Sequence, residues 1–293
     1  MQHKILLFLF ISASCFSQTD VEKIKWIHGS EDCSKNKDPF AQVIEVEKDT
    51  YIIRQNKCLN YEAPFIYLFI GYREALLVDT GAKSPAGSFP LIAIVRNILE
   101  EKKNKTGKSF PLKVIHSHGH GDHKANDDQF RNLPDIELIE ATMESLISFF
   151  QLKDWPQKSS PYDLGKREIT IIPIPGHDKI SIAIYDSQTK WLLTGDTVYP
   201  GRLYVADWVA FKTSIERLIE FANSHTVSFL MGNHIEMSDK GGVDYPTGTI
   251  FQPHEHRLPL NITILKEIRG TFFNRVEAPT REVHSEFIIE AVK

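Results

Sequence analysis

The sequence predicts a layered α/β fold, on the strength of three observations. Early in the chain, apolar runs of strand length are separated by short polar turns. From residue 90 onward, strand-like runs alternate with segments whose apolar residues recur at helical spacing. The 293 residues are 42% hydrophobic and 25% charged, which excludes a disordered, collagen-like or coiled-coil chain. Together these features are typical of mixed sheets with helices packed outside them.

The expected elements begin with hairpins. Residues 42–54 alternate between apolar and polar, and the apolar runs 65–70 and 75–78 are separated by the polar turn 71–74. A helix is expected over 90–101, with one apolar face formed by Leu91, Ile94, Val95, Ile98 and Leu99. Further strands are expected at 113–115, 168–172, 181–185, 191–194, 227–231 and 284–292, and further helices at 142–152, 211–222 and 262–268. Nothing marks a second domain, so residues 18–293 are expected to form one.

The charge balance bears on the class of partner. Lys and Arg number 34 and Asp and Glu 38, which gives a formal net charge of −4. A protein built to grip nucleic acid or an anionic membrane needs an excess of basic residues. We therefore expect no nucleic-acid partner. No transmembrane span is expected either, and the expected partner is a small-molecule substrate. The sequence carries no prediction of the oligomeric state.

The first residues resemble a targeting segment. Lys4 precedes the apolar run 5–13, which is too short for a membrane span of ~20 residues. A basic start, a short apolar core and small residues after it predict a secretory signal peptide over residues 1–17, cleaved after Ser17. A lipid-attachment site at Cys15 and an uncleaved anchor are the alternatives. We expect an exported protein, periplasmic or secreted, with a lipoprotein as the less favoured form.

Export makes a disulfide between Cys33 and Cys58 plausible. In the chain-entropy model, closing a loop of this length contributes about 3–4 kcal/mol. Two unpaired, buried thiols are the alternative, because spacing alone does not establish disulfide geometry.

The segment richest in chemistry runs from His116 to His123, with the letters HSHGHGDH. Histidine is the commonest protein ligand for zinc, and aspartate also binds it. Side chains two residues apart on an extended chain point the same way, so His118 and His120 can reach one ion together. Asp122 and His123, on a turn, can reach a second ion beside it.

Three later strands each end in glycine beside a ligand-type residue. His177 follows Pro-Gly, Asp196 follows Thr-Gly and His234 follows Gly-Asn. Ligands at strand ends beside glycine are held rigidly and can approach an ion closely. These residues are candidates to complete two metal sites.

The pattern His118-x-His120-x-Asp122-His123, followed by His177, Asp196 and His234, resembles the metallo-β-lactamase superfamily from about residue 51 to residue 234. The resemblance implies a four-layer αββα sandwich. It implies that His118, His120 and His177 bind a first metal and that Asp122, His123 and His234 bind a second. It also implies that Asp196 bridges the two ions.

The resemblance also implies a cofactor and a mechanism. The expected ions are two Zn²⁺, with iron or manganese as alternatives. Two adjacent cations lower the pKa of a water between them, and the hydroxide attacks a polarised carbonyl. Asp122 would orient this hydroxide, and Asp79 would support the metal-binding loop from behind.

A bridging Asp196 is more similar to glyoxalase II and the lactonases than to the β-lactamases that give the superfamily its name. We therefore expect an exported hydrolase of an ester, thioester or lactone. A β-lactamase and a mononuclear iron sulfur dioxygenase are the main alternatives, and a nuclease and a non-catalytic metal binder are less favoured.

Other candidates carry competing interpretations. Tyr199 lies three residues after Asp196, as does a substrate-contacting tyrosine in some lactonases, but packing in its own turn explains it equally well. Residues 201–210 either wall a substrate pocket or belong to the core. His116 is expected not to bind metal. His254 and His256 are expected to be solvated loop residues, unless their loop folds over the site.

Overall fold

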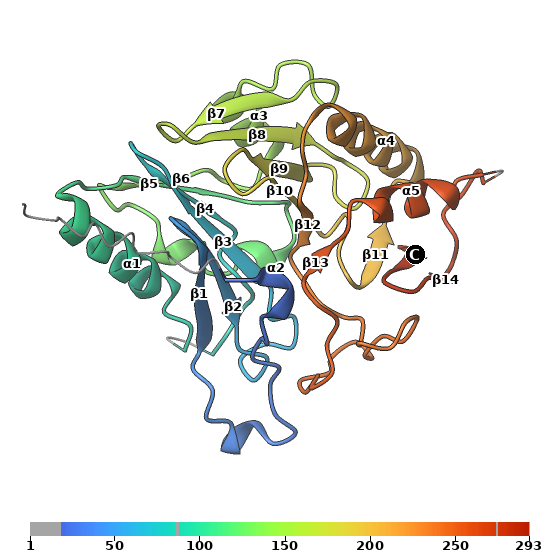
Figure 1. Cartoon of the computed structure of the whole chain (residues 1–293), viewed down its shortest axis with the longest axis horizontal. Coiled ribbons are helices and arrows are strands. Elements are labelled where there is room, and N and C mark those ends of the chain that lie inside the picture. The colour runs from blue at the N-terminus through green and yellow to red at the C-terminus, as the bar shows by residue number, and fades with distance from the viewer. Residues whose placement is uncertain (1–18, 86–87, 274, 293) are drawn as a thin grey trace, which may run out of the picture.

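The computed structural model describes residues 19–85, 88–273 and 275–292, so the predicted signal peptide lies outside the described residues. Two six-stranded sheets face each other, and a three-stranded sheet accompanies the second (Figure 1). Helix α1 covers one outer side, while α4 and α5 lie on the other. This arrangement confirms the predicted αββα order of layers.

The first sheet has the strand order β1-β2-β3-β4-β5-β6. Neighbours are antiparallel as far as β4, and β4, β5 and β6 are parallel. Its strands are β1 (Ala41–Glu47), β2 (Thr50–Gln55), β3 (Phe65–Ile70), β4 (Ala75–Val78), β5 (Leu112–Ile115) and β6 (Ile136–Leu138). The hairpin predicted over 42–54 is β1 and β2.

The second sheet has the order β13-β12-β10-β9-β8-β7, in which β10 and β12 are parallel. Its strands are β7 (Ser160–Asp163), β8 (Glu168–Pro173), β9 (Ile182–Asp186), β10 (Trp191–Gly195), β12 (Phe229–Gly232) and β13 (Pro259–Leu260). The third sheet contains β11 (Arg202–Val205), β15 (Ile288–Ala291) and β14 (Glu282–Val283). Strand β11 runs parallel to β15, so the chain's last strand is paired with the segment that follows Asp196.

The helices are α1 (Leu91–Thr106), α2 (Gly121–Lys124), α3 (Met143–Phe150), α4 (Trp208–Ser224) and α5 (Thr263–Gly270). Short 3₁₀ turns occupy Val21–Lys23, Cys33–Lys35 and Asp127–Gln129. Helix α1 ends at Gly107, whose left-handed φ of 71° lets its N–H reach the carbonyl of Lys103. Helix α4 begins where the Asp207 carboxylate accepts a hydrogen bond from the N–H of Ala210.

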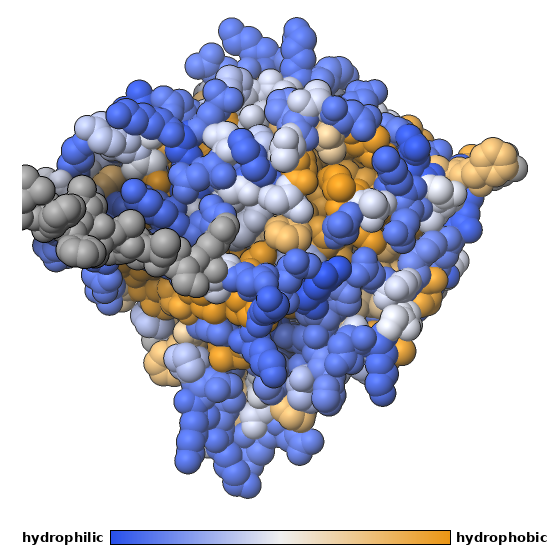
Figure 2. Space-filling model, viewed as in Figure 1, coloured by the Kyte–Doolittle hydropathy of each residue, from blue (hydrophilic) through white to orange (hydrophobic). Residues whose placement is uncertain are grey.

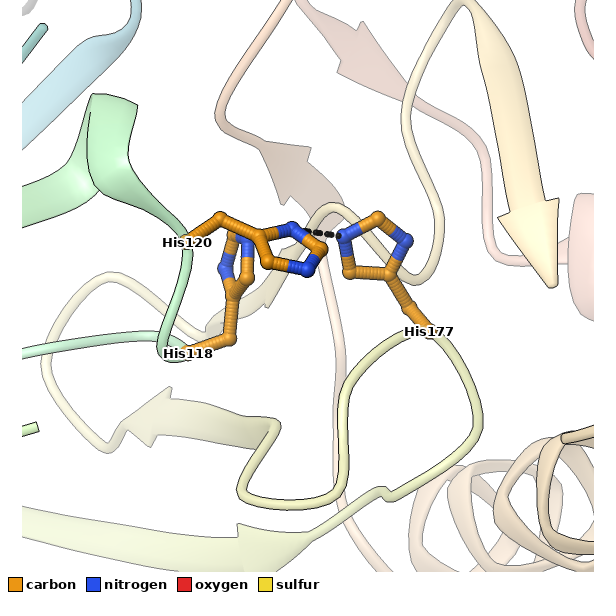
Figure 3. A group of neighbouring side chains, drawn as sticks. All are labelled: His118, His120 and His177. Atoms are coloured by element: carbon orange, nitrogen blue, oxygen red, sulfur yellow. Dashed lines mark hydrogen bonds between the residues drawn. The ribbon is translucent and has the colours of Figure 1, made fainter. Parts of the chain in front are cut away.

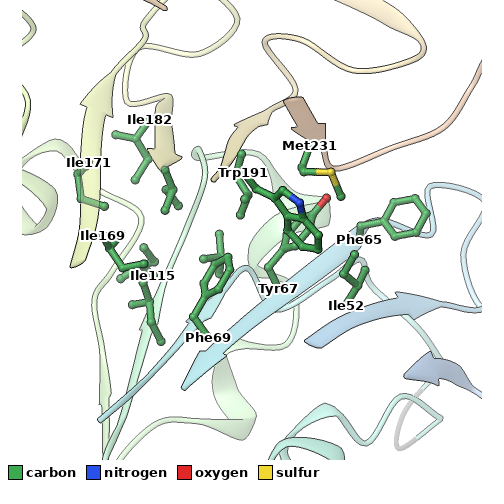
Figure 4. Packing of buried hydrophobic residues seen from close by; sticks show 14 of the residues in the cluster. Ile52, Phe65, Tyr67, Phe69, Ile115, Ile169, Ile171, Ile182, Trp191 and Met231 are labelled. Carbon is green, nitrogen blue, oxygen red and sulfur yellow. The ribbon is translucent and has the colours of Figure 1, made fainter. Parts of the chain in front are cut away.

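Side chains on the two faces of each central strand enter different cores. In β3, Phe65, Tyr67 and Phe69 point into the core between the two sheets, where they meet Ile171 and Trp191 of the second sheet (Figure 4). The intervening Ile66 and Leu68 pack against α1 instead. This strand is buried on both faces, which explains why its sequence is a continuous apolar run rather than an alternation.

The outer side of the second sheet forms a separate core with α4 and α5. Phe211, Ile215 and Leu218 of α4 pack there with Ile264 and Ile268 of α5. Leu203, Val205 and Trp208 are buried in the same core, which settles the interpretation of most of the 201–210 segment. Its remaining aromatic residue, Tyr204, faces elsewhere and is described below.

The tertiary structure adds features that the sequence left open or missed. Cys33 and Cys58 form a disulfide, with 5.3 Å between their Cα atoms. The strands β6, β7, β11, β13 and β14 were not predicted. Each contains four residues or fewer, too few to show a periodicity of their own.

Hydrophilic residues cover most of the face seen in Figure 2, with hydrophobic residues showing between them. Within the described residues, no helix is long and apolar enough to cross a membrane.

Candidate metal centre

Four strands direct their carboxyl ends toward one edge of the sandwich. Asp79 follows β4, and the motif that contains His118 and His120 follows β5. In the second sheet, Asp196 directly follows β10 and His234 comes two residues after β12. Strands that run in the same direction end at the same edge, so residues far apart in sequence meet there.

The seven predicted ligands gather there in two groups. His118, His120 and His177 form one group. Asp122, His123, Asp196 and His234 form the other. In each group the candidate ligand atoms lie within 4.8 Å of one another. Figure 3 shows the first group, in which His120 Nδ1 and His177 Nε2 face each other at 3.0 Å.

Hydrogen bonds fix the outer nitrogen of several of these rings. His177 Nδ1 donates to the carbonyl of Tyr204 at 2.8 Å, and His234 Nδ1 donates to that of Glu62 at 3.1 Å. A carbonyl oxygen can only accept, so the Nε2 atom of each neutral ring carries a lone pair. His123 Nδ1 lies 2.9 Å from an oxygen of Asp79, with the same consequence.

His118 is held in the same way through a serine. The Ser117 hydroxyl donates its proton to Asp79 at 2.8 Å, so it accepts from His118 Nδ1 at 3.1 Å. His118 Nε2 is left buried without a partner. This serine thus orients the ring and sends its lone pair toward the other ligands.

On the inner side of the cluster, ring nitrogens and carboxylate oxygens that accept hydrogen bonds face one another. The Nε2 atoms of His123 and His234 are 3.3 Å apart, and Asp122 Oδ2 lies 3.2 and 3.3 Å from them. The Oδ1 atom of Asp196 is buried without a partner. Buried acceptors that face one another need a shared positive charge, and a donor set of imidazole and carboxylate suits zinc. The residues therefore fit a metal centre.

The electrostatics of the cluster agree with that conclusion. Burial works to raise the pKa values of Asp122 and Asp196, but the neighbouring histidines hold both well below the usual range. Burial works to lower the pKa of His234, but Asp196 and Asp122 raise it to about 9. Burial lowers the pKa of His118 well below its usual value. The cluster as a whole favours a positive charge at its centre.

Asp79 connects the two sheets behind the cluster. Its carboxylate accepts hydrogen bonds from the N–H of Ser117 at 2.7 Å, from His123 and from the Asn233 amide at 2.5 Å. Its φ of 71° lies in the left-handed region, which few residues other than glycine adopt. The residue thus supports the metal loop, as expected, and holds the His234 loop in place as well.

Glycine is required at two of the strand ends. A Cβ on Gly176 would lie 2.5 Å from the Cα atom of Phe211, so only glycine lets the His177 turn pack on α4. Gly195 has a φ of 55°, and a Cβ there would lie 3.2 Å from that of Ser117. These two close approaches bring His177 and Asp196 to the motif.

The remaining histidine candidates are engaged elsewhere. His116 lies between Asp127, at 2.9 Å from its Nε2, and the carbonyl of Ile139, at 3.2 Å from its Nδ1. His254 has a 74% exposed side chain, and His256 lies 3.2 Å from Glu286. None of the three belongs to either ligand group of the described residues.

Between those two histidines lies a residue that sequence reasoning missed. Glu255 forms a two-pronged ion pair with the fully buried Arg54 of β2, at 2.5 and 2.6 Å. The loop over 238–261 is therefore tied to the first sheet. The only hint in the sequence is an arginine in an otherwise apolar strand.

Tyr199 lies beside the cluster but its hydroxyl is occupied. It is buried, its ring lies 5.8 Å from that of His234, and its hydroxyl contacts the carbonyl of Arg202 at 2.5 Å. The same hydroxyl contacts Glu236 at 3.0 Å. Its role as a substrate contact stays a prediction.

A cavity of about 320 Å³ opens beside the ligands. It is lined by Glu62, His120, His177, Asp196, Tyr199, Tyr204, Ala206, His234, Glu236 and Val292. Sequence reasoning missed Glu62, Glu236 and Val292, which come from three distant segments. For Tyr204, the sequence offered one indication: polar and apolar residues alternate over 202–205, which places Arg202 and Tyr204 on the same face of a strand.

The layers and the cluster define a metallohydrolase-type αββα protein. The model of the metallo-β-lactamase superfamily matches residues 61–228, more than half of the chain, and the chain belongs to this superfamily. The resemblance seen in the sequence is thereby confirmed.

Relatives in this superfamily include the acyl-coenzyme A thioesterases MBLAC2 of Bos taurus and Homo sapiens. Each is 27% identical over 178 residues, which cover 56% of this chain and 62% of the relative. The match thus spans less than two thirds of the length of either relative. Among solved structures, a metallo-β-lactamase from Pontibacter korlensis is 14% identical, with a TM-score of 0.49 over 80% of this chain and 100% of that one. One from Hirschia baltica is 16% identical, with a TM-score of 0.48 over 67% of this chain and 91% of that one.

Proposed function

We propose that this protein is an exported, metal-dependent hydrolase that uses two zinc ions to cleave an acyl thioester, an ester or a lactone. The observation that carries the proposal is the cluster of five histidines and two aspartates, in which His118 Nε2 and Asp196 Oδ1 are buried without a partner. The superfamily match and the named thioesterases support a hydrolase, and favour a thioester among these substrates.

The protein's own side chains divide the work. His118, His120 and His177 would hold one ion, and Asp122, His123 and His234 the other, with Asp196 between them. When bound, the ions supply an acidified water and a Lewis acid for the carbonyl. The side chain of Asp122 is 24% exposed and that of Asp196 10%, so Asp122 is the more open of the two to solvent and would hold and orient the water.

The cavity lining limits what part of a substrate enters. None of its described lining residues is a lysine or an arginine, while Glu62 and Glu236 are carboxylates. The phosphates of coenzyme A would find no cationic partner there, so we propose that the acyl group and the thioester enter and the nucleotide stays outside. A short thioester of N-acetylcysteamine should then be cleaved about as well as the coenzyme A thioester.

Export is the remaining part of the proposal. A disulfide persists in oxidising compartments, and the bond between Cys33 and Cys58 supports a location outside the cytosol. The amino-terminal sequence of the protein released from cells would begin after Ser17. An intact start at Met1 would contradict cleavage.

The test is to purify residues 18–293 and to measure bound metals by elemental analysis. Asp196→Ala is compared with the control Asp128→Ala, which alters an aspartate with a 95% exposed side chain. We expect two zincs per chain in the wild type and the control and fewer in Asp196→Ala. Thioesters, esters, lactones and β-lactams are then assayed.

Three results would redirect the proposal. A single iron per chain that survives Asp196→Ala would overturn the two-zinc hydrolase and favour a sulfur dioxygenase. Turnover of β-lactams alone would make the protein a β-lactamase. Full metal content without turnover of any of these substrates would remove the enzyme assignment.

A further inference from the structure

Two polar groups on the cavity wall are already bound to the protein. The Tyr199 hydroxyl has a single proton and two acceptors, the Arg202 carbonyl and Glu236. Glu236 also accepts hydrogen bonds from the Arg202 backbone N–H at 2.7 Å and from its guanidinium at 2.6 Å. Neither Tyr199 nor Glu236 therefore has a donor to spare for a substrate.

Tyr204 differs from both. Its hydroxyl oxygen accepts a hydrogen bond from Arg202 Nε at 3.0 Å. No acceptor for the hydroxyl proton is found among the described residues. Because the oxygen is occupied by a donor, the proton is directed away from Arg202. Tyr204 thus offers a free donor on the cavity wall.

The position of this hydroxyl is fixed from two sides. Arg202 is clamped by Asp244 at 2.8 Å and by the Tyr245 carbonyl at 2.7 Å, in addition to Glu236. The carbonyl of Tyr204 accepts from Nδ1 of His177, a candidate ligand. The residue is therefore held relative to the cluster through its backbone and relative to Arg202 through its side chain.

Tyr204 lines the cavity together with the candidate ligands His120, His177, Asp196 and His234. Tyr204 and Arg202 are two residues apart in β11 and share one face of the strand, while Leu203 is buried on the other.

We propose that Tyr204 donates the hydrogen bond that holds the acyl oxygen of the substrate, so that Tyr204 rather than Tyr199 is the substrate-contacting tyrosine. This inference rests on the proposed function. As the carbonyl carbon is attacked, negative charge grows on its oxygen and strengthens a hydrogen bond from a fixed donor. The proton stays on Tyr204 throughout. Arg202 acts as a positioning residue, and its positive charge makes the hydroxyl a stronger donor.

The first test compares Tyr204→Phe with the wild type on S-butyryl-N-acetylcysteamine. We expect kcat to fall about 100-fold with KM little changed, because the lost contact strengthens in the transition state. The zinc content should be unchanged. The control is Tyr72→Phe, which alters a 55% exposed tyrosine at the other edge of the sandwich and should keep the wild-type kcat.

The second test does not need turnover. Butyrate carries the acyl oxygens of the product, and its dissociation constant is measured by calorimetry with the zinc-loaded proteins. We expect binding to Tyr204→Phe to be about tenfold weaker than to the wild type or to Tyr72→Phe, as for one lost hydrogen bond. Equal affinities, or no butyrate binding by the wild type, would overturn the inference.

The two proposals fail separately. If the wild type cleaves the thioester and Tyr204→Phe does so equally well, the hydrolase stands and the role of Tyr204 is refuted. If no acyl substrate is cleaved but butyrate binding depends on Tyr204, the hydrolase is refuted and the acyl-oxygen contact stands. A loss of kcat in Tyr199→Phe without one in Tyr204→Phe would return the role to Tyr199.

Discussion

Two kinds of buried charged cluster occupy opposite edges of the sandwich. At the β1–β2 edge, Arg167 donates to both oxygens of Asp186, at 2.8 and 2.7 Å, to Thr50 at 2.7 Å and to the Asp49 carbonyl at 2.8 Å. At the metal edge, histidine lone pairs and carboxylates face one another, and Asp196 Oδ1 has no partner.

This difference distinguishes buried charges that are matched within the protein and stabilise the fold from buried charges that are left free to bind an ion. Taking charges out of water is costly, and the Arg167 cluster offsets this by giving donors to acceptors. The metal-edge cluster lacks the donors that would do the same, although His118, His123, His177, His234 and Asp196 are buried as well. Buried polar groups left unmatched by the protein are matched by something that binds. Removing a residue should therefore cost stability at the structural clusters and cost ion binding and activity at the metal edge.

The largest expected effect comes from removing the charge of Asp196, the proposed bridge between the two ions. Asp196→Asn keeps the shape of the side chain and removes its negative charge. We expect activity to fall about a thousandfold, equivalent to ~4 kcal/mol of transition-state stabilisation, because an ion is held less well. Thermal unfolding of the metal-free protein should change little. A variant that unfolds in the absence of metal would place Asp196 among the structural charges.

Arg54→Met removes a charge from a structural cluster instead of from the metal edge. Among the described residues, it leaves the buried Glu255 with Lys57, 3.9 Å away, as its remaining ion-pair partner. We expect the free energy of unfolding to fall by about 3 kcal/mol, measured by urea denaturation. The zinc content of the folded variant should equal that of the wild type. Loss of zinc at wild-type stability would show that Arg54 and Glu255 act in metal binding rather than in stability, which would contradict the comparison.

Asp79→Asn alters a residue that has features of both the structural clusters and the metal-edge cluster. Its carboxylate is fully matched by donors, yet it orients His123. We expect zinc affinity to fall about 10- to 100-fold, measured by competition with a chromophoric chelator. Asp127→Asn, which alters the aspartate beside His116, is the matched control and should keep the wild-type affinity.

The smallest effect concerns the pH dependence of stability. Burial, and then the charge of Arg54, lower the pKa of Lys57 from 10.5 to about 8. Between pH 8 and 10.5 the unfolded chain holds a proton that the folded chain has released, so stability should rise with pH over this window. Lys57→Met should lack this rise in a series of urea titrations. If the free energy of unfolding changes with pH by the same slope in the wild type and in Lys57→Met, Lys57 keeps its charge in the folded protein.

Much of the candidate centre could be predicted because its information is local. His118, His120, Asp122 and His123 lie within six residues, and spacing alone places them on neighbouring faces. His177, Asp196 and His234 each follow an apolar strand and a glycine, so the sequence also indicated where they stand in the fold. Apolar periodicity predicted sheets with helices packed outside them, whereas the pairing of two sheets in an αββα sandwich was implied by the resemblance to the superfamily.

The partners of those residues depended on long-range contacts. The sequence does not show that His234 donates to Glu62, or that Glu255 returns across the chain to Arg54. Nor could it choose between Tyr199 and Tyr204, because Arg202 lies close to both and only its side-chain geometry separates them.

The sequence by itself determined which residue types stand at the strand ends, because that depends on period and local turn chemistry. Only the tertiary structure decided which nitrogen of each histidine is free, which hydroxyl is free and which buried charges are matched. Hydrogen-bond direction is set by all neighbours at once, and those neighbours come from segments that chain spacing does not relate.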